Sequence, residues 1–291
     1  MERMIGVLAV GHVATAVVEG NKIVGSMRTF PPGPDERLGD VFEEMPADAI
    51  AESLSHEIEA VAQGQSIKAI GVGIPGISRS GVIEESPNLQ QIKGLNLQAM
   101  LQTSVPVVIC NDADATAAGI AAVRGQLDRL IRVWTLGTGV GFGRYPWIEG
   151  VWEGGHSVVT LDPKERFCGC GGVGHLEGIL GHRAMRLRFL DLEPDEVFAN
   201  ARAGDERCSS FVKLAHRALA AATATTVHMD GPGKVFITGP NARFINLELL
   251  NLYLHEMVKM SPLQGSMFEI ISTTDEIGVI GAAVNAGRAA Q

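Results

Sequence analysis

Two cysteines, a histidine and a glutamate stand close together in a glycine-rich segment of this chain, FCGCGGVGHLEG at residues 167–178. Cys168, Cys170 and His175 lie within eight positions, and His156 in the sequence EGGH precedes Cys168 by twelve positions. Zinc accepts two thiolates and two imidazoles in a closed tetrahedral site, and glycines let the backbone turn tightly enough for close neighbours to reach one ion. We therefore predict a structural zinc site held by these four residues.

The Cys-x-Cys pair has two other interpretations. Redox chemistry is disfavoured, because thioredoxin-type motifs separate their cysteines by two residues and a Cys-x-Cys disulfide closes a strained ring. A glycine-rich loop with unliganded thiols remains open. The chain has only four cysteines among its 291 residues, which is too few for a disulfide framework.

A candidate catalytic carboxylate lies in the sequence NDADATAAG, which follows an apolar strand and opens a helix. Asp112, at the end of that strand, is placed to accept a proton from an alcohol that attacks a phosphoryl group. The same residue could instead cap the helix. On the residues alone both interpretations remain open.

The sequence LGTGVGFG at residues 136–143 has glycines where a backbone could approach a polyanion closely. Gly137 and Gly139 flank Thr138, whose hydroxyl could donate to a phosphate oxygen. The alternative is an ordinary glycine-rich hairpin turn.

The string Cys-x-Cys-Gly-x-x-Gly-His-x-Glu, with Glu-x-Gly-His upstream, resembles the signature of the ROK proteins (repressor, open reading frame, kinase). The resemblance implies an ATP-dependent sugar kinase with the two-lobed actin-like and hexokinase-like ATPase fold, an α/β fold of duplicated ribonuclease H-like domains. The family usually has cysteine where this chain has His175. Histidine is an equally good zinc ligand, so the expected ligand set becomes Cys2His2.

The resemblance also implies roles for individual residues. Asp112 matches the aspartate that takes the proton from the sugar hydroxyl, and Asp114 replaces the family's second asparagine. The residues expected to bind the sugar are Gly76, Asn88, Asn111, Glu153, His156 and Glu177. The residues expected to bind the nucleotide are Gly137, Thr138, Gly139 and Gly239. For the segment that holds Gly76, a simple turn explains the glycines and proline equally well.

One family motif is missing from this chain. The kinases begin with a strand followed by Asp-x-Gly-Gly-Thr, a loop that supports magnesium and the phosphates of ATP, whereas this chain reads GVLAVGHVAT. Leu8 stands where the aspartate is expected, Val10 replaces a glycine, and His12 falls at the threonine position. A leucine cannot hold magnesium or its waters. Either nucleotide binding is rearranged, or the chain is a non-catalytic pseudokinase that binds sugar without phosphorylating it.

The hydrophobic pattern predicts alternating strands and helices that would position these residues in two lobes. The lobes are expected at 1–117 with 279–291, and at 118–278. The predicted strands are 4–10, 14–20, 22–30, 67–76, 105–110, 130–139, 140–150, 234–239 and 268–273. The predicted helices are 46–64, a short one within 86–102, 112–125, 206–227, 241–260 and 277–289.

Composition limits the partners. The formal net charge of −9 argues against general nucleic-acid binding, which needs a basic face. The sequence has no run of about 18 apolar residues and no signal-peptide pattern, so we expect a cytoplasmic protein without a membrane segment. A sugar-responsive repressor is disfavoured, because strand-like sequence begins near residue 4. A small sugar is the expected partner, and the resemblance implies a homodimer.

Overall fold

The computed structural model describes residues 2–32, 44–86, 89–150 and 153–290. The chain forms two compact units. The first unit comprises residues 1–131, 143–151 and 273–291, and the second comprises 132–142 and 152–272. The domain boundaries expected at residues 117 and 279 stay a prediction.

The first unit contains a five-stranded sheet in the order β3-β2-β1-β4-β7. Its strands are β1 (Arg3–Ala9), β2 (Val13–Glu19), β3 (Lys22–Phe30), β4 (Ala69–Ile74) and β7 (Val107–Asn111). The first three strands form an antiparallel meander, whereas β1, β4 and β7 are parallel. In that parallel part, Leu8 is paired with Gly73, and Ile74 with Asn111. The carboxyl ends of three strands therefore meet at one edge, where α/β folds commonly bind ligands.

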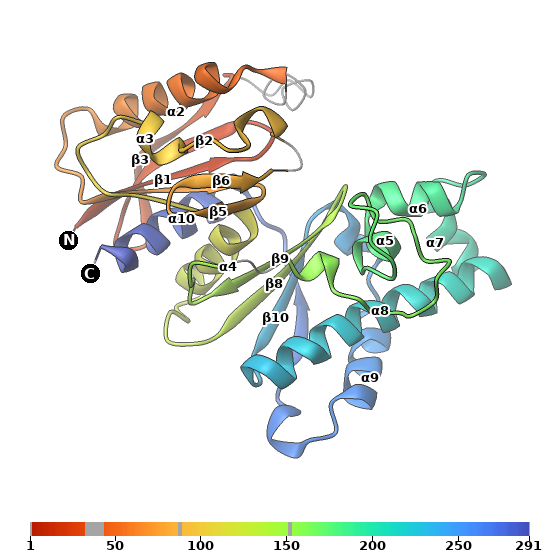
Figure 1. Ribbon diagram of the computed structural model, residues 1–291. Coiled ribbons are helices and arrows are strands. Elements are labelled where there is room, and N and C mark those ends of the chain that lie inside the picture. Colours follow the sequence, from red (N-terminus) through yellow and green to blue (C-terminus); the bar gives the residue numbers. More distant parts are fainter. Residues whose placement is uncertain (1, 33–43, 87–88, 151–152, 291) are drawn as a thin grey trace. The chain divides into compact units, whose positions relative to one another are not determined.

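Helices cover both faces of this sheet (Figure 1). Ile5 and Val7 of β1 pack with α2 (Ala47–Ala62) on one face. Leu8 points to the other face and packs with α10 (Asp275–Ala289), because neighbouring side chains of a strand alternate between faces. Helix α4 (Asp112–Val123) lies against α10.

Glycine makes the close approach of α4 and α10 possible. A Cβ atom at Gly281 would lie 1.7 Å from the carbonyl oxygen of Ala115, and one at Gly119 would lie 1.8 Å from that of Ile277. Any side chain at either position would force the helices apart.

The second unit contains a four-stranded sheet in the order β11-β10-β8-β9. Its strands are β8 (Ile131–Leu136), β9 (Val140–Tyr145), β10 (Lys234–Thr238) and β11 (Met267–Ile270). The long helix α8 (Glu206–Asp230) and helix α9 (Leu247–Met257) share a core with this sheet, around the fully buried Trp134. The indole N–H of Trp134 donates to Thr223 of α8 at 3.0 Å, so the buried ring has no unsatisfied polar group.

The predicted strands and long helices are confirmed, with ends that move by a few residues. The predicted start of the helix over 241–260 is wrong. Asn246 caps α9 by accepting from the Leu249 N–H at 3.0 Å, and a separate 3₁₀ turn occupies Pro240–Phe244. The elements that sequence reasoning missed are β5 (Ile77–Arg79), β6 (Val82–Glu85), α5 (Glu177–Leu180), α6 (His182–Arg188) and α7 (Pro194–Arg202). Among the described residues, no helix is both long and apolar enough to span a membrane.

Candidate functional site

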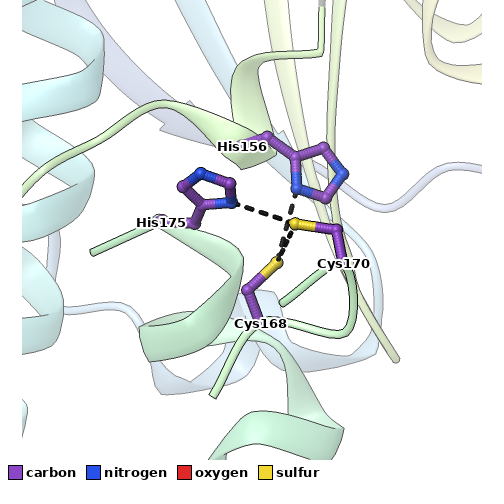
Figure 2. Close-up of side chains that lie close together, drawn as sticks. All are labelled: His156, Cys168, Cys170 and His175. Carbon is purple, nitrogen blue, oxygen red and sulfur yellow. Dashed lines mark hydrogen bonds between the residues drawn. The ribbon is translucent and has the colours of Figure 1, made fainter. Parts of the chain in front are cut away.

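Figure 2 shows the side chains of His156, Cys168, Cys170 and His175 pointing toward one another. One ligand atom from each of the four lies within 4.8 Å of all the others. The two Sγ atoms are 3.3 Å apart. Cys168 Sγ lies 3.4 Å from His156 Nδ1, and Cys170 Sγ lies 3.2 Å from His175 Nδ1.

These distances fit one tetrahedral zinc ion. Zn–S bonds of about 2.3 Å place two sulfur ligands roughly 3.8 Å apart, so small side-chain shifts would admit the ion. Burial raises the pKa of the Cys168 thiol to about 12, and burial lowers the pKa of His175. The imidazole is therefore held in its neutral form, which binds metal, whereas the buried thiol needs a cation to become a thiolate.

Backbone pairing brings the two ligand segments side by side. The Val159 N–H donates to the Gly174 carbonyl at 2.8 Å, and the Leu176 N–H donates to the Ser157 carbonyl at 3.0 Å. A Cβ atom at Gly172 would lie 2.0 Å from the His175 ring. The glycine spacing read from the sequence is thus a steric requirement of this turn.

Glu177 links the Cys/His cluster to the glycine-rich turn at residues 137–139. Its Oε2 accepts from the Val140 N–H at 3.2 Å, and its Oε1 lies 3.3 Å from Cys168 Sγ. A Cβ atom at Gly139 would lie 2.5 Å from Glu177 Oε2, so the glycine leaves room for the carboxylate. A displacement of the cysteine turn would therefore move the Glu177 carboxylate, which accepts a hydrogen bond from the glycine-rich turn.

The turn at residues 137–139 gathers the other predicted nucleotide-binding positions of the second unit. Asn241 Nδ2 donates to the Gly137 carbonyl at 3.0 Å, and the His182 N–H donates to the same oxygen at 3.0 Å. Gly239 has φ +93°, and a Cβ atom there would lie 2.5 Å from the Leu136 carbonyl. Thr138 is exposed beside them. The structure thus brings Gly137, Thr138, Gly139 and Gly239 together.

Glu153 and His156 lie next to each other in the same unit. His156 Nε2 is 4.0 Å from Glu153 Oε2, while its Nδ1 faces Cys168. Burial raises the pKa of Glu153. The carboxyl group is close to an imidazole and only partly exposed, which suits a hydrogen bond to a neutral polar ligand.

In the first unit, Asp112 lies at the carboxyl end of β7, as the sequence predicts. It does not cap α4. The cap is Asn111, whose Oδ1 accepts from the Ala113 N–H at 2.8 Å while its Nδ2 donates to the Gly76 carbonyl at 2.9 Å. The capping interpretation is therefore wrong for Asp112, because the neighbouring amide already satisfies the helix end. Asn88 lies outside the described residues.

Asp114 is buried and its Oδ1 accepts from the Arg144 N–H at 2.8 Å. This hydrogen bond joins α4 to Arg144, in the part of β9 that belongs to the first unit. The buried Asp114 carboxylate thus has a structural contact. This separates it from the half-buried Asp112, which lies two residues earlier.

The turn after β1 does not fit a magnesium ion held by a carboxylate at residue 8. Leu8 lies between two glycines instead, since a Cβ atom at Gly278 would be 2.6 Å from Leu8 Cδ2 and one at Gly73 would be 3.4 Å from Leu8 Cδ1. Beside it, His12 Nε2 lies 2.6 Å from Asp275 Oδ2. The hydrogen bond to Asp275 raises the pKa of His12.

Sequence reasoning missed Asp275 and Arg183. The two partners His12 and Asp275 are 263 positions apart, and no motif connects them. Arg183 lies in α6, an element that was not predicted, and its backbone N–H donates to the Thr138 carbonyl at 3.4 Å.

Comparison with known proteins gives consistent results. Residues 35–288 match the ROK family. A glucokinase from Pyrobaculum calidifontis is 30% identical over 245 residues, which cover 78% of this chain and 81% of that protein. An N-acetylmannosamine kinase from Haemophilus influenzae is 28% identical over 187 residues, covering 58% of this chain and 61% of that protein. The ROK hexokinase of Thermus thermophilus superposes with a TM-score of 0.79 at 26% identity, covering 99% of this chain and 98% of that one.

Proposed function

The chain belongs to the ROK family, and we propose that it transfers the γ-phosphoryl group of ATP to a hydroxyl group of a hexose or of an amino or N-acetyl sugar. It has the actin-like and hexokinase-like fold of the family's kinases. Similar proteins are named glucokinase and N-acetylmannosamine kinase. The observation in the structure that carries the proposal is the position of Asp112 at the carboxyl end of β7.

Asp112 acts as the general base in this proposal. Its carboxylate accepts the proton of the attacking sugar hydroxyl while the sugar oxygen forms a bond to the γ-phosphorus. The bond between that phosphorus and the bridging oxygen breaks, and ADP leaves with the bridging oxygen. Asn111 caps α4 and binds the Gly76 carbonyl, which holds the adjacent backbone in a fixed place.

The other sugar contacts come from the groups around the Cys/His cluster. Glu153, His156 and Glu177 bind hydroxyls, and Gly76 and Asn88 belong to the segment that closes over the sugar. Support comes from the raised pKa of Glu153, caused by burial, and from the short path that joins Glu177 to the glycine-rich turn. Gly137, Thr138, Gly139 and Gly239 bind the nucleotide.

His156, Cys168, Cys170 and His175 would hold the zinc ion, which fixes the loop that carries His156 and Glu177. Four protein ligands leave no open position for substrate, so the metal is structural. Magnesium would neutralise charge on the ATP phosphates, but Leu8 offers it no ligand. A homodimer and a cytoplasmic location complete the proposal; light scattering on purified protein tests the former.

The test is ATP-dependent phosphorylation of a sugar panel, followed by ADP release and by mass spectrometry of the sugar product. The panel contains glucose, mannose, glucosamine, N-acetylglucosamine and N-acetylmannosamine. Formation of a sugar phosphate with equimolar ADP supports the proposal. ADP release without a sugar phosphate contradicts it.

A second function is favoured by one observation. Leu8 fills the space between Gly73 and Gly278, so the first phosphate loop is packed with apolar atoms. A sugar-binding protein without kinase activity would show this feature. Calorimetric titration separates the two functions, because a pseudokinase binds a sugar of the panel without binding magnesium-ATP.

A further inference from the structure

A hollow of about 690 Å³ lies on the second unit, between α6, the start of α7 and the exposed Thr138. Helix α6 is fixed to the glycine-rich turn by its own backbone. The His182 N–H donates to the Gly137 carbonyl at 3.0 Å, and the Arg183 N–H donates to the Thr138 carbonyl at 3.4 Å. The Thr138 hydroxyl and the side chains of α6 therefore keep a defined spacing across this hollow.

The acidic side chains that line the hollow already have partners. Asp191 accepts from Arg207 at 3.0 Å, and Glu193 pairs with Arg186 at 2.9 Å. The carboxylate of Glu196 accepts from the Glu193 N–H at 2.8 Å and caps α7. These contacts neutralise or occupy the negative groups of the lining.

Arg183 differs from the other arginine of the hollow. Its guanidinium has no ion pair and no hydrogen bond with any residue of the described ranges, whereas Arg186, on the same helix, is paired with Glu193. A guanidinium carries its charge at every physiological pH and presents a fixed fork of donors. The lining of the hollow thus contains one guanidinium that is not paired with a carboxylate of the described residues.

The guanidinium of Arg183 is directed toward the Cys/His cluster. A Cβ atom at Gly169, between the two cysteines, would lie 3.1 Å from Arg183 Nη1 and 3.9 Å from Glu177 Oε1. Glycine at this position lets the guanidinium lie over the cysteine turn. The guanidinium therefore lies near the cysteine turn, while the backbone of the same residue is bonded to the turn that carries Thr138.

We propose that Arg183 binds the phosphate chain of the phosphoryl donor, together with the Thr138 hydroxyl. This inference rests on the proposed function and names a residue that no motif assigns. Guanidinium and phosphate form paired, charge-assisted hydrogen bonds, which are the stronger kind in proteins. Arg183 supplies the positive charge on the second unit, while Leu8 removes a magnesium ligand from the first. The donor is a nucleoside triphosphate or an inorganic polyphosphate, because both present the same chain.

The experiment compares wild type, Arg183→Gln, Arg183→Lys and Arg186→Gln by calorimetric titration with magnesium-ATP and, separately, with inorganic tripolyphosphate. Arg183→Gln is expected to weaken binding by about tenfold to a hundredfold, because one charge-assisted contact is lost. Arg183→Lys keeps the positive charge but lacks the forked donors of a guanidinium. Its affinity for the probes is therefore expected to lie between those of wild type and Arg183→Gln. Arg186→Gln is the matched control, one turn away on α6, and is expected to stay within about threefold of wild type.

The outcomes separate this inference from the proposed function. Binding of either probe that depends on Arg183, in a protein that phosphorylates no sugar, supports the inference and removes the proposed function. Loss of ATP binding alone identifies a nucleotide donor, and equal loss for both probes identifies the phosphate chain as the recognised part. If Arg183→Gln binds both probes as wild type does, or wild type binds neither, the inference is overturned. Thermal unfolding confirms that the variants are folded, as expected for an exposed side chain.

Discussion

The Cys/His cluster and the turn after β1 are both places where the sequence predicts ligand chemistry, but different contacts hold them in shape. In the cluster, polar groups face one another, and Glu177 connects Cys168 to the Val140 N–H. In the turn, the side chain of Leu8 packs against two glycines, and His12 is bonded to Asp275. The first arrangement presents the ligand types of a metal site, whereas the second is held by apolar packing and one hydrogen bond.

This difference shows that the loss of the aspartate at residue 8 is compensated by its surroundings. Gly73 and Gly278 leave the space that the half-buried side chain of Leu8 fills, and each Å² of apolar surface removed from water there contributes about 25 cal/mol to stability. The turn is therefore adapted to an apolar side chain. A kinase with this turn must neutralise the phosphates elsewhere. Arg183, which has no ion pair among the residues that the structure describes, is therefore informative.

Removal of the metal is expected to have the largest effect. Wild type purified without added metal should contain one zinc per chain, and Cys168→Ser should contain none, since each structural ligand is needed to close the tetrahedron. Structural zinc contributes about 10–16 kcal/mol of binding free energy in small domains, so loss of the ion should unfold at least the segment around residues 153–178. Elemental analysis and thermal unfolding with and without a chelator measure both effects.

Cys208→Ala is the control for this experiment. Cys208 is buried in α8 and is not part of the cluster, so this variant should lose some stability but keep its zinc. A zinc-free wild-type protein that is fully folded would show that the cysteines are unliganded core or loop residues.

The second effect concerns the base. Asp112→Asn keeps the shape of the side chain but cannot accept a proton, so turnover should fall by about 10²- to 10⁴-fold while sugar binding is spared. Asp128→Asn, at an exposed aspartate that follows α4, should leave turnover unchanged. Initial rates and sugar titrations measure the two properties separately. Full turnover in Asp112→Asn would assign the base to another carboxylate.

The third effect tests the turn after β1 directly. We expect weak turnover in wild type and an increase in the triple variant Leu8→Asp, Val10→Gly, His12→Thr, because a restored electrostatic contact to the phosphates is worth about 3 kcal/mol, or roughly two powers of ten in rate. The same triple variant with Asn in place of Asp at residue 8 is the matched control, since it has the same shape without the charge. Steady-state rates at saturating sugar give the comparison. Equal rates in the two triple variants would mean that charge at residue 8 is irrelevant.

The Cys/His cluster could be predicted from the sequence because its ligands are close in the chain and its glycines mark a tight turn. The assignment of Asn111 as the helix cap could not, because a shift of one residue depends on the local backbone angles. For Leu8, the sequence indicated only that the expected aspartate is missing. Its packing role could not be predicted, because its contacts come from Gly73 and Gly278, which are far away in the sequence.

The environment of Arg183 could not be predicted from the sequence either. Within the described residues Arg183 has no ion pair, because Asp191 is paired with Arg207 and Glu193 with Arg186, and such pairs depend on how α6, α7 and α8 pack. The strand and helix pattern was predictable because hydrophobic periodicity is local. Short helices such as α6 were missed, because one or two turns do not produce a clear period.

The smallest effect should come from the His12–Asp275 pair. The hydrogen bond to Asp275 raises the pKa of His12 above that of the unfolded chain, so the folded state binds the proton more tightly. The resulting stabilisation is fully present below about pH 6.5 and is lost as the pH rises through the folded-state pKa. The free energy of unfolding of wild type minus that of His12→Gln should therefore decrease between pH 5.5 and 8.5, by less than about 1 kcal/mol because both side chains are about one-third exposed.

His255→Gln, at an exposed histidine of α9 without a side-chain hydrogen bond in the described residues, serves as the control and should show a weaker pH dependence. Denaturant titrations across this range measure the difference. A difference that stays constant with pH would mean that His12 is neutral in the folded protein and that the pair is an uncharged hydrogen bond.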